Sequence, residues 1–521
     1  MASGRTLEPS AVVAHTASKA RSEPQASEVH ETRPQLVRPI ARDALVLAVV
    51  LAAAVAAYRP YLALGHLGWD TYPLILTSRV ASAADLLGVF REELMDGRYP
   101  GGHFYRPVTT LSFALDHAIW GLEPSGYHLT DLALLLACAI GVAALGRRLL
   151  GPGVGPLTAA LLFALHPLHV ETLPVAARRA DVLAQLFTLL ALVTAPRAGF
   201  RAGLCAVAAA LAVGSKESGA VVVPLLLALA CTESGPERGW ARLRAALRKC
   251  ALPWAAVGLV LLVRTLVLGG IGGHPGSSLL AGAGRGLAVA PHYTSLLLMP
   301  QPLVRDPALA WGLVVAAAAA LVTALALLAR GSSTRRLLLV CGVWLLTSLW
   351  LTGVSGEIAS WYAMAFLPAF SLLIGALAQG TARCAGERRR VAFVLGAVLS
   401  ALLIAQALRY TPLLHDYPEW PLVSRRSQEF LQRVQAAVEH AAPGDVRSVP
   451  GIPLGIATPL DRVGVRSALG LAEYSVEAWA ALVAPRAPVV VTRLPADSPR
   501  LPHPEAILIE TTPDPEAGVL P

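Results

Sequence analysis

Long apolar runs alternate with short charged segments along most of this chain. Many of the runs are roughly 17 to 22 residues long, and about 20 mostly apolar residues make a helix that crosses the hydrocarbon core of a bilayer. We therefore expect an all-α polytopic membrane protein with roughly 11 transmembrane helices. The predicted spans are residues 43–62, 127–146, 156–168, 181–196, 202–214, 219–232, 251–269, 308–329, 337–353, 361–379 and 391–410.

The charges between the runs predict how the chain is oriented. Arginines gather in alternate short connections, and such clusters mark the cytoplasmic side of a membrane. Segment 284–300 is ambiguous, because counting it as a span would move the arginines near 330–336 and 383–390 to the outside. Charge bias favours a re-entrant or surface helix there. The N-terminus is then cytoplasmic, and the C-terminus is extracytoplasmic.

Three regions differ in composition. Residues 1–41 are rich in Ser, Pro, Arg and Glu and predict a disordered cytoplasmic tail. Residues 42–410 form the transmembrane domain, with a first outer loop at 63–126 whose helices would lie on the outer face of the membrane. Residues 411–521 predict a small extracytoplasmic α/β region or a partly ordered tail. Its signals are a helical pattern at 424–440 and β-branched runs at 488–493 and 506–511.

Overall composition supports the membrane assignment. Hydrophobic residues make up 55% of the chain and charged residues only 15%, whereas about 25% charged is typical of soluble domains. The net charge of +9 comes largely from arginines in the connections. There is no basic face with interleaved aromatic residues, so we expect no nucleic-acid partner.

The connection at 166–181 carries an unusual number of ionisable residues between two apolar runs. Such residues are costly near a bilayer and usually mark a site or an internal ion pair. His166, His169 and Glu171 have ligand chemistry, but their spacing matches no strong metal motif, so a divalent metal is possible and not favoured. The alternatives are phosphate binding through Arg178, Arg179 and their neighbours, or simple helix capping, with Asp181 near the start of the next helix.

Other charged residues stand close to the predicted spans. Asp70, between the aromatic residues Trp69 and Tyr72, is either a carboxylate that takes a proton from an acceptor or a solvated loop acid. Lys216 and Glu217 form either a phosphate contact or an adjacent pair that faces water. Arg106, which precedes Pro107, is likewise either a phosphate contact or a residue that faces water.

Three linked motifs carry a resemblance to a known family. They are YRPVTTLSFALDHAIWG from Tyr105, HPLHVETLPVAARRAD at 166–181, and GSKESGAVVVP at 214–224. In this order and spacing they resemble the transmembrane-and-TPR O-mannosyltransferase family and its bacterial relatives. The resemblance implies a fold of the GT-C class of membrane glycosyltransferases and a polyprenyl-phosphate sugar as donor. It also implies that Asp70 is the catalytic base. The residues that match the second and third motifs are His166, Glu171, Arg179, Asp181, Lys216 and Glu217.

The chain departs from the family pattern in three places. Asp70 is followed by Thr71 rather than by a second acid, which puts a metal-assisted reaction in doubt. The late motif is present only as SWYAMAFLP at 360–368, without the arginine expected there. No TPR repeat is visible, so a protein-docking platform is missing or replaced by the C-terminal region.

The expected activity is therefore an inverting transfer of a mannose-like sugar to an acceptor hydroxyl on a protein, lipid or glycan. Arg106, Arg179 and Lys216 would stabilise the departing lipid phosphate. The alternatives are a catalytically degenerate scaffold of the same fold, or a lipid or solute transporter. A transporter predicts charges and broken helices within the spans, whereas these charges lie in loops at one face. Frequent Ala, Leu, Arg and Gly with short loops favour a bacterial inner membrane.

Overall fold

The computed structural model describes ten stretches of the chain. They are residues 34–98, 102–195, 200–233, 239–300, 306–328, 332–382, 387–459, 468–483, 488–493 and 506–514. Residues 1–45 and 46–521 form two separate units, and the elements described below belong to the second. The first unit contributes the start of helix α1 (Pro34–Tyr58). The end of the segment predicted as a tail is therefore helical, and residues 1–33 lie outside the described part.

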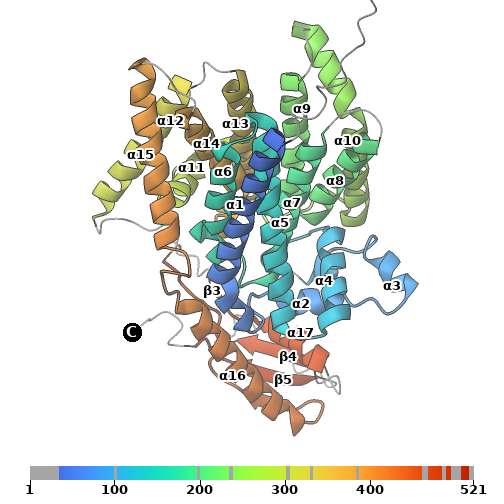
Figure 1. The fold of residues 1–521 in the computed structure, drawn as a ribbon. Helices are drawn as coiled ribbons and strands as arrows, with labels where there is room; N and C mark the ends of the chain where they lie inside the picture. Colours follow the sequence, from blue (N-terminus) through green and yellow to red (C-terminus); the bar gives the residue numbers. More distant parts are fainter. Residues whose placement is uncertain are drawn as a thin grey trace, which may run out of the picture. The chain divides into compact units, whose positions relative to one another are not determined.

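Every segment predicted as a span forms a helix (Figure 1). After α1 these helices are α5 (Pro124–Leu150), α6 (Val154–Leu165), α7 (Arg179–Thr194), α8 (Phe200–Ser215), α9 (Val222–Glu233), α10 (Gly239–Leu268), α12 (Pro307–Leu328), α13 (Ser332–Ser355), α14 (Leu367–Ala382) and α15 (Glu387–Arg409). In the described stretches, five helices are long and apolar enough to cross a bilayer, namely Ala41–Ala63, Pro124–Leu150, Gly239–Leu268, Pro307–Leu327 and Ser333–Ser355. The predicted fold class is confirmed, and the chain is an integral membrane protein.

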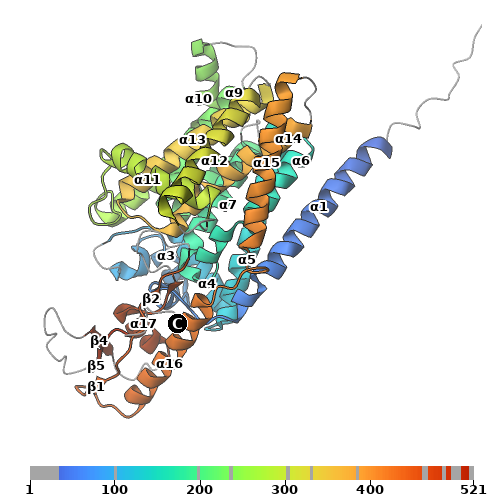
Figure 2. The same ribbon diagram turned by 90° about the vertical axis from the view of Figure 1, so that its left-hand side faces the viewer.

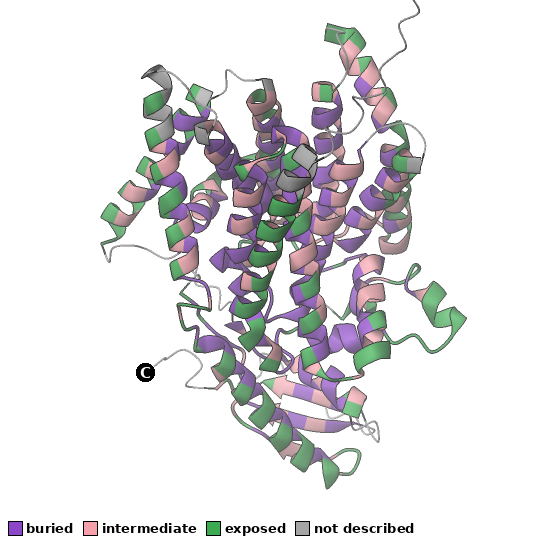
Figure 3. Ribbon diagram, in the orientation of Figure 1, coloured by how far each residue is buried: buried purple, intermediate pink, exposed green. Residues whose placement is uncertain are grey.

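The helices between α5 and α10 are shorter than a bilayer is thick. Helices α6 and α9 each have 12 residues, which gives a length of about 18 Å against a hydrocarbon core of about 30 Å. Polar turns follow α6 and α8: η3 (Pro167–Glu171) and η4 (Ala176–Arg178) lead into α7, and η5 (Glu217–Val221) leads into α9. The residues of η3 and η4 are almost all buried, whereas Lys216 and Glu217 at the start of η5 are partly exposed. Figure 3 colours the described residues by their burial.

The ambiguous segment forms helix α11 (Gly282–Leu298), which packs closely along α13. A Cβ atom on Gly353 would lie 2.0 Å from the carbonyl oxygen of Gly282, so the two backbones touch at this point. Whether α11 crosses the membrane stays a prediction.

The first outer loop contains the helices that its sequence predicted. They are α2 (Thr71–Thr77), α3 (Ala83–Gly88), η2 (Leu94–Gly97) and α4 (Pro107–Trp120), and the short helix η1 (Arg59–Ala63) precedes the loop. Helix α3 begins with a capping box, in which Ser82 and Asp85 exchange side-chain and backbone hydrogen bonds. It has no buried residue, whereas α2 is largely buried.

The C-terminal region is a small α/β structure, as predicted. Helices α16 (Glu419–Glu439) and α17 (Glu473–Val483) accompany two small sheets in the part of the chain that the structure describes. Strands β1 (Val446–Ser448), β5 (Ile507–Thr511) and β4 (Val489–Arg493) pair in parallel in that order, and β2 (Gly455–Ile456) pairs with β3 (Ala468–Leu469) antiparallel.

This region gathers at the end of the helices where α4 lies (Figure 2). It shares one apolar core with α2: Ile75 of α2, Phe430 of α16 and Val476 of α17 belong to the same cluster of buried side chains. The alternative of a partly ordered tail therefore does not describe these packed elements. The C-terminal region and helix α2 of the first outer loop therefore pack against each other.

The contact between α11 and α13 gives a test of this packing. Gly353→Leu should lower the apparent melting temperature of the detergent-solubilised protein by several degrees, because overpacking costs about 1–3 kcal/mol. Gly342→Leu is the matched control on the same helix, since a Cβ there meets nothing within 4 Å. Equal melting temperatures for the two variants would contradict the backbone contact.

Candidate active site

A cavity of about 310 Å³ lies between the polar turns and the long helices. One part of its wall is polar and is formed by Arg106, Asp181, Lys216, Glu217, Arg264 and His274. The other part is apolar and includes Leu261 of α10, Leu279, and Trp344 and Leu351 of α13. The cavity therefore offers charged partners at one side and a hydrophobic surface at the other.

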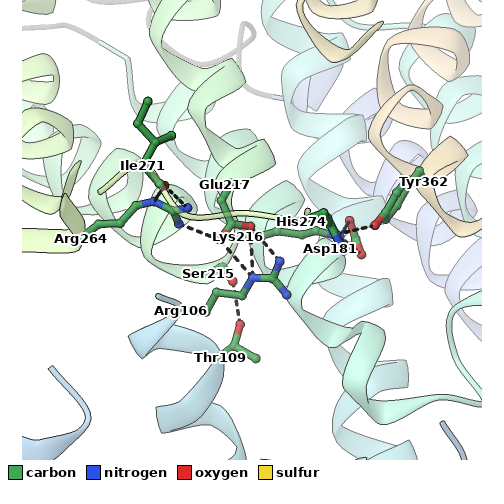
Figure 4. Close-up of polar contacts among 10 residues, drawn as sticks. All are labelled: Arg106, Thr109, Asp181, Ser215, Lys216, Glu217, Arg264, Ile271, His274 and Tyr362. Atoms are coloured by element: carbon green, nitrogen blue, oxygen red, sulfur yellow. Dashed lines mark hydrogen bonds and ion pairs between the residues drawn. The ribbon is translucent and has the colours of Figure 1, made fainter. Parts of the chain in front are cut away.

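Glu217 joins two arginines that are far apart in the sequence (Figure 4). Arg106, just before α4, donates to both carboxylate oxygens of Glu217. Its Nε lies 3.3 Å from Oε1 and 3.1 Å from Oε2, and its Nη2 lies 2.8 Å from Oε2. Arg264 of α10 donates to Oε1 at 2.8 Å and to the Ile271 carbonyl oxygen at 2.7 Å. The carboxylate thus ties the first outer loop, the turn after α8 and α10 together.

A second ion pair lies beside the first. The Lys216 ammonium donates to both oxygens of Asp181, each at 2.7 Å. It also lies 4.7 Å from the centre of the Tyr362 ring, a cation–π contact. The Tyr362 hydroxyl lies 3.3 Å from Nε2 of His274. These contacts bring together α7, the turn after α8, the 269–281 loop and the η6 turn (Ser360–Ala365).

The electrostatics of the cluster favour an anion. The described polar wall includes three basic residues, Arg106, Lys216 and Arg264, and two acids. Burial lowers the pKa of the Lys216 ammonium, and the carboxylate of Asp181 opposes that shift. Burial alone would raise the pKa of Glu217, but the two guanidinium groups outweigh it and hold that pKa well below its usual range. Burial and the nearby cations lower the pKa of His274 to about 4, so it is neutral at pH 7. One positive charge is left uncompensated.

Asp70 lies at the start of α2, outside the lining of this cavity. Its Oδ1 accepts a hydrogen bond of 2.7 Å from the hydroxyl of Tyr474 in the C-terminal region. Burial raises the pKa of the Asp70 carboxyl, while Tyr474 and the charges of Arg106 and Arg178 oppose that rise. Asp70 is therefore within electrostatic range of the cavity's Arg106.

The two histidines of the central motif bind backbone groups. His166 Nε2 lies 3.2 Å from the Leu297 carbonyl oxygen, and His169 Nε2 lies 2.5 Å from that of Phe163. Both rings are buried. Within the described stretches, no group of three or more His, Cys, Asp or Glu side chains is placed to hold a metal ion.

Glu171 and Arg178 form a second buried contact with the C-terminal region. The Thr458 hydroxyl donates to Glu171 Oε1 at 2.6 Å, and Arg178 donates to the Glu171 carbonyl oxygen. The Arg178 guanidinium stacks 3.8 Å from the centre of the Trp361 ring. This pair lies near Asp70 rather than in the cavity lining, and its predicted donor contact stays a prediction.

Arg179 is fully buried in an ion triad. It lies 2.6 Å from Asp116 of α4 and 2.5 Å from Asp131 of α5. The structure does not bring Arg179 to the cavity, so its immediate role is to join α4, α5 and α7. The cavity lining contains Arg106, Asp181, Lys216 and Glu217 of the residues predicted from sequence.

Arg264, His274 and Tyr362 line the cavity but were not among the candidates from sequence. Arg264 had a signal, because it is the one charge inside the apolar run 251–269, and a charge within a span marks a site by default. His274 and Tyr362 had weaker signals in a Gly-rich loop and in the incomplete late motif. The side chain of Arg264 is buried.

Comparisons with known proteins agree with the motif analysis over part of the chain. No family model matches. Protein O-mannosyl-transferase TMTC2 of Mus musculus is 45% identical over 95 residues, which are 18% of this chain and 11% of that protein. Protein O-mannosyl-transferase Tmtc1 of Drosophila melanogaster is 32% identical over 155 residues, 29% of this chain and 18% of that protein. The chain resembles the O-mannosyltransferases. The predicted resemblance is confirmed for these stretches, which span less than a fifth of either relative.

Two solved structures align with much of this chain at low sequence identity. ArnT from Cupriavidus metallidurans, bound to undecaprenyl phosphate, aligns with a TM-score of 0.45 at 14% identity over 81% of this chain and 83% of its own. The oligosaccharyltransferase AglB from Archaeoglobus fulgidus aligns with a TM-score of 0.48 at 10% identity over 85% and 63%.

The buried triad around Arg179 predicts a large effect on stability. Arg179→Ala leaves Asp116 and Asp131 buried without their cation, and breaking a buried pair costs about 3–5 kcal/mol. The variant should therefore melt well below the wild type or fail to insert stably, whereas Arg425→Ala, an exposed arginine on α16, should melt as the wild type does. Thermal unfolding in detergent measures both, and a wild-type melting temperature for Arg179→Ala would refute the structural role.

Proposed function

We propose that this protein is a membrane glycosyltransferase that moves a mannose-like sugar from a polyprenyl-phosphate donor to an acceptor hydroxyl. The observation that carries the proposal is the cavity with three cations on one wall and apolar side chains on the other. Such a surface suits a ligand with an anionic head and a hydrocarbon tail. The similarity to O-mannosyl-transferases supports the same chemistry.

The phosphate of the donor would lie against Arg106, Lys216 and Arg264. Arg106 and Arg264 share the Glu217 carboxylate, and Lys216 pairs with Asp181. These ion pairs would hold the three side chains together without a ligand and leave one net positive charge for the phosphate. Guanidinium groups donate in a planar fork that matches phosphate oxygens. The prenyl chain would leave between Leu261 of α10 and Leu351 of α13, both of which line the apolar wall.

The transfer itself needs a base and a stabilised leaving group. Asp70 would accept the proton of the acceptor hydroxyl while the acceptor oxygen attacks C1 of the sugar. The bond from C1 to the phosphate oxygen breaks, and the electron pair leaves with the lipid phosphate, where the cations stabilise it. Attack opposite the leaving group inverts the configuration at C1. No step requires a metal ion.

In this proposal the polar turns face the extracytoplasmic side, with the N-terminus in the cytoplasm. A bacterial inner membrane fits the composition. The acceptor, whether protein, lipid or glycan, would approach Asp70 beside the C-terminal region, because that is where the first outer loop and that region meet.

The role of Asp70 is tested by removing its basicity. Asp70→Asn should reduce the release of polyprenyl phosphate from polyprenyl-phosphate-mannose by about 100-fold or more, the usual scale of general-base catalysis. The assay uses purified protein in nanodiscs with a mixed acceptor extract. Asp96→Asn is the control, since Asp96 is an exposed acid in the same loop and Asn tolerates its positive φ. Unimpaired turnover by Asp70→Asn would show that Asp70 is not the catalytic base.

The role of Arg264 is tested on donor affinity. Arg264→Met removes one of the three cations and should weaken binding of polyprenyl phosphate by about 10- to 100-fold, because hydrogen bonds to charged groups contribute about 1.5–3 kcal/mol. Arg335→Met removes an exposed arginine at the start of α13 and serves as the control. Equal dissociation constants for the two variants, measured by thermophoresis, would mean that the phosphate binds elsewhere.

A further inference from the structure

The C-terminal region forms hydrogen bonds with the two residues that precede Asp70. The indole Nε1 of Trp69 donates to the Leu454 carbonyl oxygen at 2.8 Å, and the Ser475 hydroxyl donates to the Trp69 carbonyl oxygen at 2.5 Å. The Gly68 amide donates to the Leu469 carbonyl oxygen at 3.1 Å. The two residues before Asp70 are thus held by strand β3, by Leu454 just before β2, and by α17.

The opposite side of the segment is fixed as well. Gly68 has a φ of +92°, and a Cβ atom there would lie 2.4 Å from Cγ1 of Val175. The backbone before Asp70 therefore lies directly against the central motif on one side and against the C-terminal region on the other. It has little freedom to move the carboxylate.

Tyr474 makes the contact to the carboxylate itself. It is the second residue of α17, and its hydroxyl donates to Asp70 Oδ1 at 2.7 Å. Helix α17 is anchored by Val476 and Ala478 in the core shared with α2, and α2 begins immediately after Asp70. The donor and the acceptor of this hydrogen bond are therefore set by two helices packed on each other.

We propose that Tyr474 positions Asp70 for proton transfer, so that the C-terminal region completes the catalytic site. The hydrogen bond fixes the rotation of the carboxylate and stabilises its ionised form. This inference rests on the proposed function, in which Asp70 is the base. It assigns to residues 411–521 a direct part in the reaction instead of a peripheral one.

The direction of the pH effect follows from the groups around Asp70. Burial raises the pKa of the carboxyl, and the Tyr474 hydroxyl, Arg106 and Arg178 lower it. Removing the hydroxyl takes away a donor to the charged form, so the pKa rises further. A base is active when deprotonated, so the acid limb of the pH–rate profile should move to higher pH.

The test compares full-length Tyr474→Phe with wild type in nanodiscs. Its acid limb of kcat/KM should shift upward by about 1 pH unit, the scale of one hydrogen bond to a charged group. Ser475→Ala breaks a contact of the same helix to the Trp69 carbonyl and should leave the midpoint unchanged, even if kcat falls. A ring-fluorinated tyrosine at position 474, a stronger donor that keeps the fold, should shift the midpoint downward.

A second readout does not depend on turnover. Dicyclohexylcarbodiimide reacts with protonated carboxyl groups, so mass spectrometry of Asp70 labelling against pH reports its pKa. The pH midpoint of labelling should be higher in Tyr474→Phe than in the wild type, and it should equal the wild-type value in Ser475→Ala. An unchanged labelling midpoint in folded Tyr474→Phe would overturn the positioning role. A shifted midpoint together with normal turnover of Asp70→Asn would instead overturn the proposed function.

Discussion

The candidate site depends on one carboxylate that two arginines share. Glu217 joins Arg106 of the first outer loop to Arg264 of α10, at distances of 2.8 Å to each. Charges placed next to apolar helices are costly unless they are paired, and this pairing lets two arginines stay beside a cavity of about 310 Å³. Removing Glu217 would leave two like charges facing each other, so the acid is what makes a cationic pocket possible here.

The rest of the architecture presents this pocket to one end of the helices. The short helices α6 and α8 end in polar turns, and α7 and α9 begin directly after these turns. The first outer loop and the C-terminal region cover the same end and share a core. Asp70 sits at their junction, where burial raises its pKa and Tyr474 and two arginines oppose the rise. In the proposed function, this carboxylate acts as the base beside a cavity wall that binds the donor phosphate, and no step uses a metal ion.

Local patterns were enough to predict much of this fold. The apolar runs predicted the helices, including short ones such as that at 156–168. A buried helix needs apolar residues whatever its length, so short helices leave the same pattern in the sequence as long ones. Ordered motifs pointed to Lys216, Glu217 and Arg106, which line the cavity. The β-branched runs near 488–493 and 506–511 became adjacent parallel strands.

Long-range pairing is what the sequence could not reveal. His166 has the chemistry of a ligand, but its ring pairs with the Leu297 carbonyl oxygen, 131 residues later in the chain. Arg179 stood beside Arg178 as an equal candidate, yet two acids from α4 and α5 bury it away from the cavity. Tyr474 had no motif at all, because its significance comes from a carboxylate 404 residues earlier in the chain.

The most direct test of the central claim locates the lipid phosphate. A polyprenyl phosphate carrying a diazirine on its first isoprene unit would be irradiated with the protein in nanodiscs, and the labelled peptides identified by mass spectrometry. The account predicts labelling of the α10 segment around Leu261 and the α13 segment around Leu351, displaced by unlabelled polyprenyl phosphate. Labelling confined to other helices, or labelling that the unlabelled lipid does not displace, would contradict it.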